Sequence, residues 1–198
     1  MPVVPTRLSV GRLEILDCRL RYPPVAGGSA GRPRDLTKLV GVAVHHDAVL
    51  FEGGDRNYNG STLDEDLQRL DAIYQRGLDM QWGGFPYHFV CSPNNRVYYT
   101  QDVRHFGAQV AHRNHELVGV AGMGLFTNVE PGDPLVCAYA LGIISVYHFT
   151  GRLLDVRGHR EWAVAPDPTA CPGDTWWQWQ RRVFERITLV GRLAFPRT

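Results

Sequence analysis

Short runs of apolar residues, separated by polar and glycine-rich stretches, divide the middle of the chain into predicted strands. β-Branched and aromatic side chains dominate these runs, as is typical of strands buried in a sheet. Two runs flank Ser92-Pro93-Asn94-Asn95. Asparagine tolerates the left-handed backbone of a tight turn, so we expect a hairpin there. The predicted strands lie within LVGVAVHH (39–46), PYHFVCSPNNRVYYTQ (86–101), LVGVAGMG (117–124) and LLDVRGH (153–159).

A first helix is predicted after the glycine- and asparagine-rich loop GGDRNYNGS (53–61). Thr62, followed three residues later by Glu65, makes a capping box. Apolar residues then recur at the spacing of one helix face, and Gly77 is the expected stop. These apolar residues are Leu63, Leu67, Leu70 and Tyr74.

Two further helices follow in the second half of the chain. Asp133 and Pro134 are predicted to be the N-cap and the first position of a helix. Its apolar run LVCAYALGIISVYHF (135–149) is hydrophobic nearly all round, so we expect this helix to be the central buried one. The last helix is amphipathic, with apolar positions at Trp176, Trp179, Val183, Ile187 and Val190. Strands alternating with helices predict a single α/β domain with a central mixed β-sheet flanked by helices.

The first 38 residues differ from the remainder in composition. They hold one short apolar piece, LEILDCRL, followed by RYPPVAGGSAGRPRD, whose proline, glycine and arginine content predicts an irregular connection. We therefore expect an N-terminal extension over residues 1–38 and a catalytic domain over residues 39–198. The sequence leaves open whether the extension covers a sheet edge, forms a substrate wall or contacts a partner.

Composition narrows the cellular setting of the protein. A formal net charge of +1 over 198 residues gives no general attraction to nucleic acid. The four cysteines show no CxxC spacing, which speaks against a disulfide framework. No apolar run approaches the roughly 20 residues needed to cross a bilayer, and the start lacks the features of a secretory signal. We expect synthesis in the cytoplasm, no membrane insertion and a monomer, although the sequence leaves the oligomeric state open.

The stretch VAVHHDA (42–48) carries the first candidate chemistry. Successive side chains of a strand point to opposite faces, so His45 and His46 cannot easily share one role. A catalytic zinc site commonly takes three ligands from histidine, cysteine or carboxylate and leaves the fourth position to water. His45, His159 and Cys171 could supply such a set, because imidazole and thiolate suit zinc. By spacing alone, a strand-end histidine is more often structural, and Cys171 is equally well a buried, inert thiol.

Five stretches, in order, resemble the zinc-dependent N-acetylmuramoyl-L-alanine amidases of type 2. That family includes phage lysozyme-like amidases and the peptidoglycan recognition proteins. The resemblance covers roughly Leu39 to Val190. Its motifs are VAVHHDA, PYHFVCSPNNRVYYTQ, FGAQVAHRN, LVGVAGMG and RGHREWAVAPDPTACPGD.

The resemblance implies a site and a reaction. His45, His159 and Cys171 match the zinc ligands, while His46 is expected to pack. Zinc would polarise the amide carbonyl between N-acetylmuramic acid and L-alanine and lower the pKa of bound water towards about 7. Tyr87 and Thr169 match residues that hydrogen-bond the forming oxyanion.

Other residues near these motifs receive smaller or no roles. Glu161 is expected to orient a zinc ligand from outside the metal's contact shell. Taken without the motifs, Tyr87 would be a core aromatic residue and Thr169 a turn residue. His88 is expected to be structural. No role is assigned to His112, His115 or His148, and Trp176, Trp177 and Trp179 are expected to pack along a helix rather than stack on sugars.

Three departures from the family pattern separate the candidate functions. Gln109 stands where many relatives have histidine, which puts a substrate contact in doubt; Leu117 replaces a small serine and should alter packing. Ala121 stands where cytoplasmic muropeptide-recycling relatives carry a glutamate. A recycling amidase would therefore lack its candidate general base in this chain. We favour a lytic enzyme such as a phage endolysin, which acts on bacterial peptidoglycan after release from the cell. The alternatives are a non-catalytic peptidoglycan-binding recognition module and a cytosolic recycling amidase.

Overall fold

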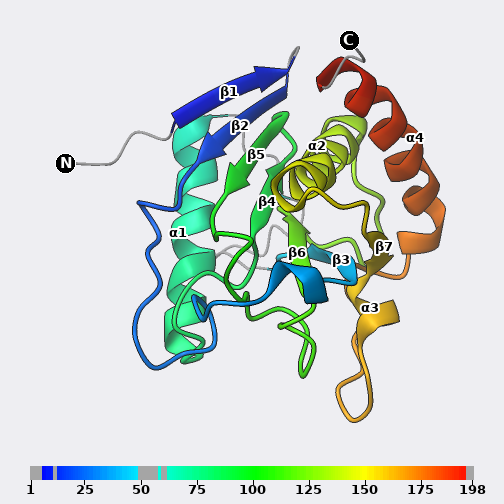
Figure 1. Cartoon of the computed structure of the whole chain (residues 1–198). Helices are drawn as coiled ribbons and strands as arrows, with labels where there is room; N and C mark the ends of the chain where they lie inside the picture. Colours follow the sequence, from blue (N-terminus) through cyan, green and yellow to red (C-terminus); the bar gives the residue numbers. More distant parts are fainter. Residues whose placement is uncertain (1–5, 11–12, 49–57, 59–61, 195–198) are drawn as a thin grey trace.

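A seven-stranded mixed sheet forms the centre of the computed structural model, which describes residues 6–10, 13–48, 58 and 62–194 (Figure 1). The strand order is β1-β2-β5-β4-β6-β3-β7. β3 pairs in parallel with β6 and β7, β4 in parallel with β6, and β2 in parallel with β5, whereas β1–β2 and β4–β5 are antiparallel. The strands are β1 (Thr6–Val10), β2 (Leu13–Asp17), β3 (Gly41–His46), β4 (Phe89–Ser92), β5 (Arg96–Tyr99), β6 (Leu117–Gly122) and β7 (Asp155–Gly158).

Helices cover both faces of this sheet, as the sequence predicted. α1 (Leu63–Asp79) lies against one face, and α2 (Asp133–Thr150) lies between the opposite face and α4 (Trp176–Ala194) (Figure 1). A short 3₁₀ turn (Leu36–Lys38) precedes β3, and the one-turn helix α3 (His159–Trp162) follows β7. In the part of the chain described above, no helix is both long and apolar enough to cross a membrane.

Apolar clusters on both faces of the sheet result from the alternation of side chains along the buried strands. Val42 and Val44 of β3 pack with α2 and α4, while Leu70 and Ile73 of α1 pack with strand residues on the other face. The α2 helix is almost entirely buried, which confirms its predicted central position. Trp176 and Trp179 of α4 are both 0% exposed, so they belong to the core as expected.

The helix boundaries follow the predicted caps with one exception. Thr62 is the N-cap of α1, and the capping box with Glu65 is formed; the helix ends at Asp79, two residues beyond the expected stop. The loop predicted before it lies outside the described residues, apart from Tyr58. The predicted N-cap of α2 was wrong, because Gly132 takes the extended backbone of the cap and Asp133 lies in the first turn. There the Asp133 carboxylate accepts a hydrogen bond from Arg182 at 2.6 Å.

The predicted N-terminal extension continues the sheet. Its apolar piece forms β2, which pairs with β5 and thereby covers that edge of the sheet. β1 adds a further strand outside β2. Residues 18–35 then run as an irregular connection to β3, as their composition predicted, while residues 1–5 and 11–12 lie outside the described part of the chain. The extension therefore supplies both a sheet edge and a long segment that can contact loops beside the site.

Candidate metal centre

The end of β3 separates the two adjacent histidines onto opposite faces of the sheet. His45 shares its face with Ala43 and is 1% exposed. His46 points to the face covered by α2, where its Nδ1 accepts the backbone N–H of Phe126 at 3.3 Å. The strand alternation thus assigns the two imidazoles to different surroundings, as predicted, and His46 packs.

The side chains of His159 and Cys171, from distant parts of the chain, meet beside His45. Each of His45, His159 and Cys171 offers one ligand atom, and these three atoms lie within 4.8 Å of one another. The imidazole centroids of His45 and His159 are 4.5 Å apart, and Cys171 Sγ lies 3.6 Å from His45 Nδ1. The sheet produces this meeting, because β7 pairs with β3 and delivers His159 at the start of α3.

Backbone hydrogen bonds hold the loop that carries Cys171 against α3. The carbonyl of Cys171 accepts the N–H of Arg160 at 2.8 Å, and its own N–H donates to Thr169 Oγ1 at 3.1 Å. The Cys171 thiol is buried. The loop therefore fixes the sulfur by main-chain contacts on both sides.

The protonation states suit a divalent cation. Burial, with His159 next in effect, lowers the pKa of His45 well below its ordinary value, and burial lowers the pKa of His159 to about 4. Both imidazoles are therefore neutral at pH 7 and can offer a lone pair. Burial raises the pKa of the Cys171 thiol to about 12, so a bound cation must displace its proton. Two imidazoles and one thiolate form a donor set that fits zinc.

An open cleft of about 440 Å³ adjoins the cluster. It leaves room for a fourth ligand to a bound metal ion and for a substrate. All three cluster residues line it, together with Tyr87 and Thr169. Asp47 also lines it, but its carboxylate is held by the buried guanidinium of Arg69 at 2.5 and 2.6 Å. Because this ion pair engages both carboxylate oxygens, Asp47 is a poor candidate for a fourth ligand.

Gln109 contacts the metal cluster directly, which the sequence interpretation missed. Its Oε1 lies 2.9 Å from His45 Nε2, and its Nε2 donates to the carbonyl of Leu117 at 2.9 Å. Because the amide oxygen only accepts, His45 Nε2 carries the proton and His45 Nδ1 presents its lone pair towards Cys171. The sequence marked Gln109 as a departure from the family pattern, but its partner depended on the fold of the loop.

The extension fastens the loop that carries Gln109. The guanidinium of Arg34 is largely buried and donates to the carbonyls of Val103 at 2.7 Å, Asn114 at 3.1 Å and Leu117 at 2.7 Å. Burial lowers the pKa of Arg34 to about 10, so the guanidinium remains charged at neutral pH. Arg34 thus joins the extension to both ends of the segment that positions Gln109.

Tyr87 and Thr169 lie where hydroxyl groups can face the cleft. The Tyr87 ring centroid is 5.1 Å from that of His45, and burial raises the pKa of Tyr87, which keeps its hydroxyl protonated. Thr169 Oγ1 accepts the N–H of Cys171, which leaves its own hydroxyl hydrogen available for donation. Their assignment to the reaction itself remains a proposal.

Glu161 acts on His159 through the backbone. Its carboxylate accepts the N–H of Gly158 at 2.7 Å and the indole N–H of Trp176 at 2.6 Å. Within the described residues it makes no hydrogen bond to the imidazole of His45 or His159. Glu161 caps α3 and thereby fixes the backbone of His159, so it can orient that residue through the main chain rather than through the ring.

His88 is structural, as predicted. Its Nδ1 accepts the N–H of Gly119 at 3.0 Å, and its Nε2 lies 3.0 Å from the carbonyl of His105. Leu117 is fully buried beside Ala43, Val110 and Trp162, in keeping with the expected effect on packing.

Because His46 and His159 are held neutral by burial, we expect the metal-free protein to lose stability in acid. Burial lowers the pKa of His46 to about 4, as for His159, against an ordinary value of 6.5. The unfolded chain therefore takes up protons first, so stability is complete above pH 6.5 and falls as the pH drops towards 4. At about pH 5, the free energy of unfolding is expected to fall by about 1–2 kcal/mol for each of the two imidazoles.

Urea unfolding in the presence of a chelator, at about pH 7.5 and about pH 5, measures this loss. His46→Asn keeps an acceptor for the Phe126 N–H and should weaken the pH dependence, whereas His112→Gln, at the exposed surface, should leave it unchanged. Equal free energies of unfolding at the two pH values would contradict the prediction.

Comparisons with known proteins identify solved structures that have the same fold. No family profile and no curated protein matches the chain. Among solved structures, peptidoglycan recognition protein SD from Drosophila has a TM-score of 0.69 at 16% identity, over 86% of this chain and 94% of that one. The Ph2119 endolysin from a Thermus scotoductus bacteriophage has a TM-score of 0.57 at 17% identity, over 87% and 98% of the two chains. N-acetylmuramoyl-L-alanine amidase LysC from Clostridium intestinale has a TM-score of 0.56 at 14% identity, over 86% and 97%. The chain has the fold that these proteins share, which confirms the fold predicted from the sequence resemblance.

Proposed function

We propose that this chain is a zinc-dependent amidase that hydrolyses the bond between N-acetylmuramic acid and L-alanine in bacterial peptidoglycan. One observation carries the proposal: His45, His159 and Cys171 place their ligand atoms within 4.8 Å of one another at the wall of an open cleft. The fold supports it, because an amidase and an endolysin share that fold. Residues 39–198 are proposed as the catalytic domain, which acts on the cell wall after release of the protein.

The residues of the cleft divide the chemical work. Zinc, when bound by the three ligands, supplies a Lewis acid and lowers the pKa of water to about 7. Gln109 keeps His45 in one tautomer and orientation. Tyr87 and Thr169 line the cleft and donate hydrogen bonds to the carbonyl oxygen of the substrate as negative charge develops on it.

Non-catalytic recognition is the second candidate, because peptidoglycan recognition protein SD has the same fold. Retention of a cysteine beside two histidines favours hydrolysis, since binding alone needs no thiolate ligand. Recycling in the cytosol is less favoured. Ala121 pairs with His45 across β3 and β6, so the position next to this ligand carries no carboxylate that could act as a base.

The test uses purified bacterial sacculi. We expect turbidity to fall and new L-alanine amino termini to appear, and we expect a chelator to stop both and added zinc to restore them. Binding to sacculi without new amino termini would refute the amidase and favour recognition. Cleavage confined to soluble anhydro-muropeptides would refute the lytic role and favour recycling.

A further inference from the structure

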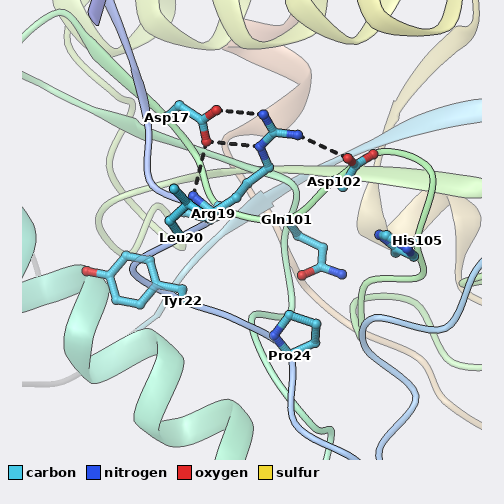
Figure 2. Close-up of a pocket in the computed structure, with 9 residues that line it drawn as sticks. Asp17, Arg19, Leu20, Tyr22, Pro24, Gln101, Asp102 and His105 are labelled. Atoms are coloured by element: carbon cyan, nitrogen blue, oxygen red, sulfur yellow. Dashed lines mark hydrogen bonds and ion pairs between the residues drawn. The ribbon is translucent and has the colours of Figure 1, made fainter. Parts of the chain in front are cut away.

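A second hollow of about 410 Å³ lies between the extension and the segment that follows β5 (Figure 2). It is lined on one side by Asp17, Arg19, Leu20, Tyr22 and Pro24, and on the other by Thr100, Gln101, Asp102 and His105. None of its lining residues lines the metal cleft. This hollow is therefore a separate feature, and the proposed hydrolysis does not account for it.

The charged groups at its rim neutralise one another. Arg19 donates to Asp17 at 2.6 and 2.9 Å and to Asp102 at 3.0 Å (Figure 2). The neighbouring Arg104 donates to Asp102 at 2.6 Å. The Arg19 guanidinium also lies 4.3 Å from the ring centroid of Tyr99. Two carboxylates thus face two guanidinium groups, so the rim offers no unpaired charge to an ionic ligand.

Gln101 is the polar group that points into this hollow. It is 2% exposed, and its Nε2 makes a single long hydrogen bond of 3.4 Å to the carbonyl of Phe106. Figure 2 shows its amide directed into the space between Tyr22, Pro24 and His105. No partner for Gln101 Oε1 exists among residues 6–10, 13–48, 58 and 62–194, and the His105 imidazole likewise makes no hydrogen bond there. The oxygen is not among the buried side-chain atoms that lack a hydrogen-bond partner, so it opens to the hollow, where it can accept a hydrogen bond from a ligand.

Apolar surface completes the hollow. The Leu20 side chain is 80% exposed at its edge, and Tyr22 and Pro24 form part of its wall. An uncharged ligand that has both hydrogen-bonding groups and an apolar face fits this lining. Acetamido sugars have these properties, because their amide N–H can donate to Gln101 Oε1 and their ring carbons can pack on the exposed Leu20 and Pro24.

We infer that this hollow binds an N-acetylated sugar of a glycan chain, with Gln101 accepting the acetamido N–H. The inference rests on the proposed function for the source of the sugar, the glycan strand of peptidoglycan. One continuous segment connects the two sites: Gln101, Asp102 and His105 line the hollow, and Ala108 to Ala111 line the metal cleft.

The test measures binding of N-acetylglucosamine tetramer by titration calorimetry and by NMR, with a chelator present. We expect saturable binding, with chemical-shift changes at the side-chain amide of Gln101 and at the ring of His105. Gln101→Leu is expected to weaken binding by at least about fivefold, as the loss of one hydrogen bond implies. Gln178→Leu, at an exposed glutamine of α4, is the matched control and should bind as the wild type does.

Three results would overturn the inference: no saturable binding, equal binding by Gln101→Leu, or shift changes confined to the metal cleft. Cellotetraose, which lacks the acetamido group, should bind more weakly, and equal affinity would refute the role given to Gln101. If Gln101→Leu fails to fold, His105→Ala replaces it, because His105 is partly exposed and its ring has no hydrogen bond to lose within the described chain.

The outcome for the sugar is independent of the outcome for hydrolysis. Sugar binding without cleavage of sacculi would refute the amidase and support the site. Cleavage of sacculi without sugar binding would support the amidase and refute the site.

Discussion

Cys171→Ser is expected to abolish zinc binding and amidase activity. In the proposed site the thiolate is a metal ligand, and a serine hydroxyl at the same position cannot be deprotonated as readily. Its loss leaves two neutral imidazoles, His45 and His159, to hold the cation. We expect zinc affinity and the rate of amide cleavage each to fall at least about 10³-fold, equivalent to about 4 kcal/mol.

The measurements are zinc content after dialysis, zinc affinity by competition with a chromophoric chelator, and release of L-alanine amino termini from sacculi. Cys137→Ser on α2 is the matched control, because Cys137 is partly buried and lies outside the metal cluster. It should retain zinc and activity. Full zinc content and activity in Cys171→Ser would show that the cluster is not the metal site.

The sequence predicts best those features that depend on local periodicity. Alternation along β3 was enough to separate His45 from His46, because a strand has a period of two residues whatever packs against it. The capping box at Thr62 and Glu65 was equally local. The order of the motifs then predicted that His159 and Cys171 lie close to His45. The distances between the three ligand atoms agree with this grouping.

Features that depend on contacts between distant segments escaped the sequence. The apolar piece at Leu13–Asp17 was seen, but its partner β5 could not be identified from its own pattern. Gln109 was recognised as a departure, but its bond to His45 exists because Arg34 holds both ends of the loop 103–117. Asp133 was assigned as a cap on residue type, whereas the backbone of Gly132 took the extended conformation one position earlier.

The extension is therefore joined to the metal centre by an unbroken chain of contacts. Arg34 holds the carbonyl of Leu117, the same carbonyl accepts the amide of Gln109, and Gln109 accepts the proton of His45 Nε2. Space for the amide depends on Gly119, because a Cβ atom there would lie 2.3 Å from Gln109 Oε1. Both bonds of Gln109 are buried and 2.9 Å long, so a change at Gln109 should affect the proposed metal site rather than remain local.

Gln109→Leu is expected to lower zinc affinity by about 10–100-fold while the protein remains folded, since this is the usual effect of removing a group that orients a metal ligand. Leucine removes the acceptor for His45 Nε2–H and the donor to the Leu117 carbonyl. His45 then loses the preference that directs Nδ1 towards Cys171 Sγ. Gln109→Glu is the matched variant, because its carboxylate also loses the donor to the Leu117 carbonyl but still accepts the imidazole proton. It therefore isolates the bond to His45, and it should retain zinc affinity to within about tenfold of the wild type.

Two readouts separate positioning from general destabilisation. Zinc affinity by chelator competition should rank wild type and Gln109→Glu above Gln109→Leu. ¹⁵N NMR of the metal-free protein should show His45 protonated at Nε2 in the wild type and in Gln109→Glu, but a mixture of tautomers in Gln109→Leu. If Gln109→Leu keeps both the zinc affinity and the single tautomer, then His45 is oriented by its burial alone. The 2.9 Å contact would in that case carry no role in the metal centre.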